Sequence, residues 1–147
     1  MNVYSYFLFL PLYSKKVRMK NVANRIWSIV VLIMAVFMFY GGVQHFINSV
    51  FYIPFVPSFL PFKMAIIYIS GVIEMAIALL LVIKKYRGIG ALSLLLLMLA
   101  FLPIHIWDVF SDAPAIGNHQ LSLIRLGMQF VFIAIAWKLK NLYFNKN

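Results

Sequence analysis

Residues 64–83 read MAIIYISGVIEMAIALLLVI, an apolar run bounded by Lys63 before it and by Lys84 and Lys85 after it. At about 1.5 Å of rise per residue, a helix over this run is roughly 30 Å long, which is the thickness of the hydrocarbon core of a bilayer. Glu74 is the only ionisable side chain near its middle, and a charge at that depth costs at least about 2.5–3.5 kcal/mol. We therefore predict a membrane-spanning helix whose carboxyl group is neutral, paired or turned toward water.

The composition of the whole chain also indicates a membrane protein. Of its 147 residues, 65% are hydrophobic and 11% are charged, whereas roughly a quarter of the residues of a soluble domain are charged. The chain has no cysteine, which excludes thiolate nucleophiles, disulfide exchange and iron–sulfur clusters with cysteine ligands. The net charge of +10 comes from short basic clusters between apolar runs. Because topology signals have this pattern, we expect a lipid bilayer as the partner and no nucleic acid.

Three further apolar runs are long enough to span a membrane, so we predict an all-α, four-helix transmembrane domain over residues 21–147. Three prolines within residues 51–61 prevent the first helix from continuing, and the aromatic residues around them favour the membrane interface. Pro103 is expected to kink the third helix. The four predicted helices cover about residues 26–48, 64–83, 88–109 and 121–138.

Residues 1–20 form an extension before this domain. The segment MNVYSYFLFLPLYS is apolar and aromatic, but it is too short to span a bilayer and contains Pro11. It lacks the basic start and the small-residue cleavage site of a signal peptide. Two interpretations stay open: an interfacial anchor, or a stretch upstream of a true start at Met19.

The distribution of Lys and Arg predicts the orientation. The amino-terminal region, the link between the second and third helices, and the carboxy-terminal tail carry five, three and three of the 13 basic residues. The opposite side of the predicted bundle has only Lys63 and Arg125. By the positive-inside rule, both termini of this multi-pass protein are expected in the cytoplasm.

The polar residues of the helices gather in the outer half of the membrane, at helical spacings of three or four. Since polar side chains in hydrocarbon face each other and not the lipid, we predict a polar pocket with Glu74 at its floor. Arg125 is the expected counter-ion of Glu74 or Asp108, and the two histidines could pass protons to Glu74. The alternative is that these groups only hold the helices together. The candidate catalytic residues are His45, Glu74 and Arg125, and the candidate pocket residues are Asn48, Tyr68, Gly71, His105, Asp108 and Gln129.

A quinone headgroup is the ligand that suits this pocket best. Such a ring needs a mostly apolar slot, a hydrogen-bond donor for each carbonyl, and a carboxylate or histidine to manage protons. A haem between two histidines and a metal on His45, His105 and Asp108 fit the pattern less well, so we expect no metal site and no covalently bound cofactor.

From residue 24 to residue 140 the chain resembles the DoxX-like family of small four-helix bacterial membrane proteins. The segments that carry the resemblance are GVQHFINS (42–49), FYIP (51–54), LPF (60–62), YISGVIE (68–74), FLPIHIW (101–107) and IRLGMQF (124–130). The resemblance implies a bacterial inner-membrane protein associated with quinone-linked redox complexes. The leading hypothesis is therefore a component that handles quinone or its protons and receives electrons from a redox partner protein. The alternatives are a non-enzymatic subunit that anchors a partner complex, and a proton or solute carrier, which would need a homo-oligomer.

Overall fold

A computed structural model of the chain describes the backbone of residues 3–144, and the side chains of residue 19 and of residues 21–144. All regular structure in this part of the chain is helical: α1 (Val3–Ile47), α2 (Ser49–Tyr52), η1 (Ile53–Phe55), α3 (Lys63–Val82), η2 (Lys84–Tyr86), α4 (Arg87–Val109) and α5 (His119–Tyr143). Four helical segments are long and apolar enough to cross a membrane, namely Asn21–Ile47, Lys63–Val82, Lys84–Val109 and His119–Tyr143. The predicted all-α fold with four apolar helices is confirmed.

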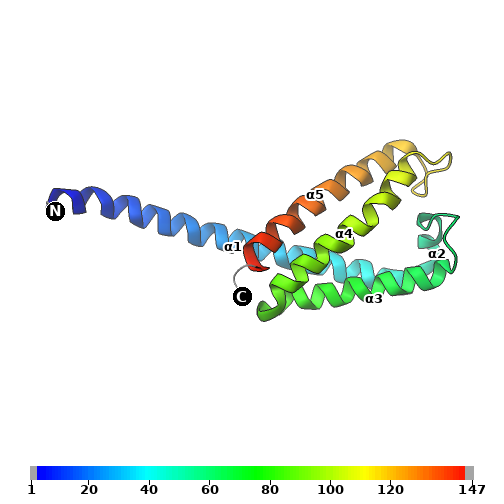
Figure 1. The fold of residues 1–147 in the computed structure, drawn as a ribbon, viewed down its shortest axis with the longest axis horizontal. Coiled ribbons are helices and arrows are strands. Elements are labelled where there is room, and N and C mark those ends of the chain that lie inside the picture. Colours follow the sequence, from blue (N-terminus) through cyan, green and yellow to red (C-terminus); the bar gives the residue numbers. More distant parts are fainter. Residues whose placement is uncertain (1–2, 145–147) are drawn as a thin grey trace.

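The first helix differs from the prediction at its start. It was expected near residue 26, but α1 runs without a break from Val3 to Ile47 and extends far beyond the other helices (Figure 1). A proline removes one backbone donor, and α1 continues through Pro11. The prediction of an interfacial anchor concerns side chains before residue 19, and these lie outside the part of the chain whose side chains the structure describes.

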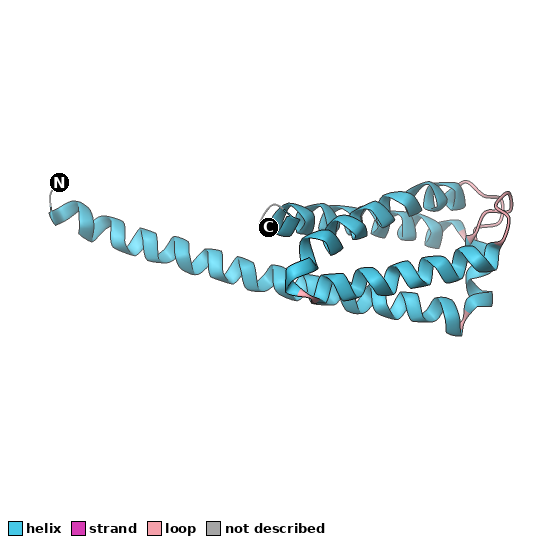
Figure 2. Ribbon diagram, turned by 60° about the horizontal axis from the view of Figure 1, so that its bottom comes forward, coloured by secondary structure: helices cyan, strands magenta, loops and turns pink. Residues whose placement is uncertain are grey.

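The four long helices form two antiparallel pairs, α1 with α3 and α4 with α5 (Figures 1 and 2). The pairs converge at the end where η2 connects α3 to α4, and they diverge toward the loops that follow η1 and α4 (Figure 1). The buried apolar core fills the converging end. Its largest fully buried side chains are Val31, Leu81, Leu94 and Leu139.

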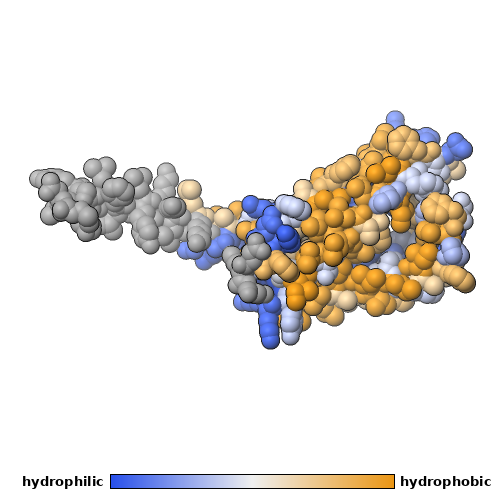
Figure 3. All heavy atoms as spheres, viewed as in Figure 1, coloured by the Kyte–Doolittle hydropathy of each residue, from blue (hydrophilic) through white to orange (hydrophobic). Residues whose placement is uncertain are grey.

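The surface has the banding that a bilayer requires. Large apolar side chains are exposed along all four helices, and they form a continuous band in the space-filling view (Figure 3). Hydrophilic residues gather at the converging end of the bundle (Figure 3). Basic side chains at this end stack on aromatic rings, Arg87 on Tyr143 and Lys138 on Trp27.

Two glycines let α1 and α3 cross at backbone contact. A Cβ atom placed on Gly42 would lie 2.7 Å from the carbonyl oxygen of Gly71, and one placed on Gly71 would lie 2.8 Å from the carbonyl oxygen of Gly42. The Cβ on Gly71 would also lie 2.8 Å from the Cβ of His45. Small residues at a helix crossing allow such an approach, and this one brings α3 within reach of His45.

Gly71→Ala is expected to lower the free energy of unfolding by about 1–3 kcal/mol, because the added methyl group must push two backbones apart. Gly127→Ala on α5 is the matched control, since its Cβ would meet nothing within 4 Å. Thermal or denaturant unfolding in detergent micelles measures both variants. Equal stability of Gly71→Ala and Gly127→Ala would show that the crossing is not tight.

Candidate functional site

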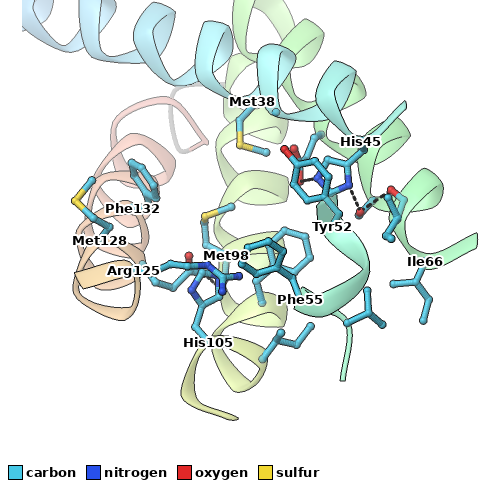
Figure 4. Close-up of a pocket in the computed structure, with 18 of the residues that line it drawn as sticks. Met38, His45, Tyr52, Phe55, Ile66, Met98, His105, Arg125, Met128 and Phe132 are labelled. Atoms are coloured by element: carbon cyan, nitrogen blue, oxygen red, sulfur yellow. Dashed lines mark hydrogen bonds and ion pairs between the residues drawn. The ribbon is translucent and has the colours of Figure 1, made fainter. Parts of the chain in front are cut away.

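A cavity of about 410 Å³ lies between the two helix pairs, in the part of the bundle where they diverge (Figure 4). All four long helices line it, together with α2, η1 and the loop before α5. Most of the lining is apolar and rich in Phe, Met and Ile. The polar lining residues are His45, Tyr52, Ser70, Glu74, His105, Arg125 and Gln129. Five of the nine residues proposed from the sequence thus meet at one cavity.

One wall carries an acid–imidazole pair. His45 Nε2 on α1 lies 3.4 Å from Glu74 Oε1 on α3, and both side chains are largely buried. The second carboxylate oxygen of Glu74 rests against the backbone of Gly41, where a Cβ would come within 2.8 Å of Oε2. Gly41 and His45 are four residues apart and therefore share the face of α1 that meets Glu74.

Ser70 fixes the orientation of the imidazole. Its hydroxyl donates to the carbonyl oxygen of Ile67 at 2.8 Å, and its Oγ lies 3.2 Å from His45 Nδ1. Since a hydroxyl has one proton, Ser70 accepts from Nδ1–H of His45. Nε2 then faces Glu74 Oε1 across 3.4 Å. This wall therefore holds an imidazole nitrogen and a carboxyl oxygen side by side at the cavity.

Tyr52 covers this pair from the loop side. Its ring stacks on the His45 ring with a centroid distance of 4.2 Å and an interplanar angle of 19°. Burial raises the pKa of the Tyr52 phenol, and the charge of Glu74 raises it further. The phenol is therefore neutral at physiological pH and remains a hydrogen-bond donor beside the acid–imidazole pair.

The opposite wall carries a cation. Arg125 on α5 donates from Nη1 to Asp108 Oδ2 on α4 at 2.8 Å, and its guanidinium lies 4.3 Å from the centroid of the Phe55 ring. The partner of Arg125 is thus Asp108 and not Glu74. The other oxygen of Asp108 accepts from the backbone N–H of Ala115 at 2.7 Å. Asp108 is only 2% exposed and does not line the cavity, so it holds Arg125 and the loop in place.

Two further polar groups complete the α4–α5 side. Gln129, which is 3% exposed, donates from Nε2 to the carbonyl oxygen of Met98 at 2.5 Å and ties the two helices together. His105 lines the cavity, and its Nδ1 is buried without a hydrogen-bond partner among the described residues. A buried polar atom without a partner is costly. The Nδ1 atom of His105 has less than 1 Å² of accessible surface, so it does not face the open space of the cavity, which His105 lines with other atoms.

Besides Asp108, three predicted pocket residues do not line the cavity. Asn48 is exposed and donates to Gln44 on the outside of α1. Tyr68 stacks on Phe46 on the outer face of the α1–α3 pair, with a centroid distance of 5.3 Å. Gly71 serves the helix crossing described above. Helical spacing gave the correct helices, but it could not give the rotation of each helix about its axis.

The sequence analysis missed Ser70 and Tyr52. Ser70 precedes Glu74 by four residues, so the same spacing rule could have found it. Nothing local predicted Tyr52, because its place depends on how α2 folds back. No group of three or more His, Cys, Asp or Glu side chains that could hold a metal occurs in the described part of the chain.

Comparison with known proteins gives one family. A family model described as Domain of unknown function (DUF8561) matches residues 34–140, which include every residue that lines the cavity. No curated protein and no solved structure matches the chain.

Proposed function

The chain belongs to the DUF8561 family, and we propose that it is an inner-membrane protein that binds a quinone headgroup in the cavity and exchanges protons with it. Under this proposal the converging, basic end of the bundle faces the cytoplasm, in accordance with the positive-inside rule. The cavity then lies in the outer half of the membrane. The resemblance to DoxX-like proteins supports the proposal by analogy only.

The observation that carries the proposal is the placement of polar groups on two opposite walls of an apolar cavity. A quinone ring is flat and apolar, with one carbonyl oxygen at each end. The His45–Glu74 pair supplies a proton donor on one wall, while the guanidinium of Arg125 supplies N–H donors on the other (Figure 4).

Conversion of a quinone to a quinol takes up two electrons and two protons. The proposed role of this chain is on the proton side, where His45 and Glu74 hold a shared proton next to the ring and the neutral phenol of Tyr52 adds a donor. The electrons come from a separate redox protein that carries a flavin, a haem or an iron–sulfur cluster. This partner is part of the proposal.

Native mass spectrometry of the gently solubilised protein tests the proposal. We expect a quinone to co-purify in stoichiometric amount and to be lost from Glu74→Ala. Tyr68→Ala is the matched control on the same helix, because Tyr68 faces away from the cavity, and it should retain the quinone. A folded protein that carries no quinone but holds a stoichiometric partner polypeptide would overturn the proposal in favour of an anchoring subunit.

A further inference from the structure

We infer that the ligand reaches the cavity sideways from the hydrocarbon of the bilayer, through an opening between α1 and α5 that is bordered by Phe37, Met128 and Phe132. This inference rests on the proposed function for the identity of the ligand. It also specifies the ligand class, which is a headgroup with an apolar chain that stays in the membrane.

The border residues belong to the cavity and to the outer surface at the same time. Phe37 and Met128 both line the cavity, yet they are 50% and 46% exposed, within the apolar band. Glu74 and Gln129, which line the same cavity, are only 7% and 3% exposed. The cavity therefore reaches the surface beside Phe37 and Met128.

The contacts between α1 and α5 leave room for such an opening. The rings of Phe37 and Phe132 touch with a centroid distance of 5.0 Å, and Lys138 lies over the Trp27 ring nearer the converging end. Toward the loops the two helices separate. Met128 and Phe132 lie along α5, across the cavity from His45 and Tyr52 (Figure 4).

The loop end of the cavity is lined by aromatic rings, one of which, Phe51, is itself 63% exposed. Aromatic rings from α2 and η1 pack against one another at the loop end, Phe51 on Tyr52 and Phe51 on Phe55. This aromatic roof is held at both sides, because Tyr52 stacks on His45 and Phe55 lies under Arg125. These rings narrow the loop end of the cavity, and Phe51 marks a second place where its lining reaches the surface.

The depth of the opening determines what can pass. Phe37 precedes Gly41 by one helical turn, and Gly41 touches the Glu74 carboxylate. The opening is therefore level with Glu74, near the middle of the span, where a bilayer offers hydrocarbon and almost no water. A water-soluble solute would have to enter at the loop end, past Phe51, whereas a lipid-soluble quinone already lies at the depth of this opening.

The absence of cysteine from the chain makes a cross-linking test possible. A Phe37→Cys/Phe132→Cys variant, bridged in proteoliposomes by a short bifunctional thiol reagent, is expected to bind a decyl-substituted benzoquinone at least about tenfold more slowly, because binding would then require a conformational opening. Phe46→Cys/Tyr68→Cys is the matched control, since those rings also stack between helices, at 5.3 Å on the outer face. An unchanged rate in the bridged Phe37/Phe132 variant, with binding still dependent on Glu74, would overturn the lateral route and leave the proposed function intact.

A second measurement does not depend on quinone binding. A spin label on Met128→Cys should be relaxed strongly by oxygen, which concentrates in lipid, and weakly by a water-soluble nickel chelate. Strong relaxation by nickel would show that the opening faces water and would overturn the inference. Because Met128 is 46% exposed, a label that reports lipid shows only that this face of α5 meets lipid, and the bridged Phe37/Phe132 variant tests the route itself.

Discussion

Replacement of Glu74 by glutamine is expected to lower quinone-coupled proton transfer by about 10²- to 10⁴-fold, the usual contribution of a positioned general acid–base group. Glutamine has nearly the shape of glutamate, so it fits between Gly41 and His45 and can still bond to Nε2. It cannot exchange a proton in that bond. The protein should therefore fold and accumulate normally while the coupled reaction fails.

Quinone-linked electron transfer in membranes of the producing cells, normalised to the amount of the protein, measures this effect. Asp112→Asn is the control, because it makes the same acid-to-amide change at an exposed loop residue. It should leave the rate unchanged. An unaltered rate in Glu74→Gln would remove Glu74 from the mechanism, even if the cavity binds quinone.

The helices could be predicted because their signals are local. Apolar runs bounded by lysines fixed the spans of α3 and α4 to within one or two residues of the observed ends. α1 ends at Ile47, one residue before the predicted end, but the prolines do not cause this end, because Pro54 lies seven residues further on, inside η1. Pro11 does not end α1 either, since a single missing donor does not stop a helix.

The pairing of charges could not be predicted in the same manner. Helical spacing made Glu74 and Asp108 equally good candidates for the ion-pair partner of Arg125. The choice between them depends on how α5 is positioned along α4, which the sequence does not give. Asp108 and Arg125 both lie near the loop end of their helices and meet at 2.8 Å. Glu74 lies deeper, so its partner is His45 on the neighbouring helix. The role of Tyr52 depends on how α2 folds back, and the periodicity of the sequence does not predict where α2 packs.

Asp108→Ala is expected to lower the free energy of unfolding by about 3–5 kcal/mol, the usual cost of removing one member of a buried ion pair. Asp108 is 2% exposed, and its two oxygens satisfy the Arg125 guanidinium and the N–H of Ala115. Alanine would leave both donors without an acceptor. Unfolding in detergent micelles measures the loss, and Asp112→Ala, in the same loop region but exposed, should stay within about 0.5 kcal/mol of the wild type.

A double variant separates the two roles of this pair. If Asp108 serves mainly to neutralise Arg125, Asp108→Leu/Arg125→Met should recover most of the lost stability, because apolar side chains of similar size often replace a buried ion pair without loss. The same variant should still lose quinone affinity, since the wall that carries Arg125 would lack its donors. A double variant as unstable as Asp108→Ala would show instead that the bond to Ala115 holds the loop and that neutralising Arg125 matters little.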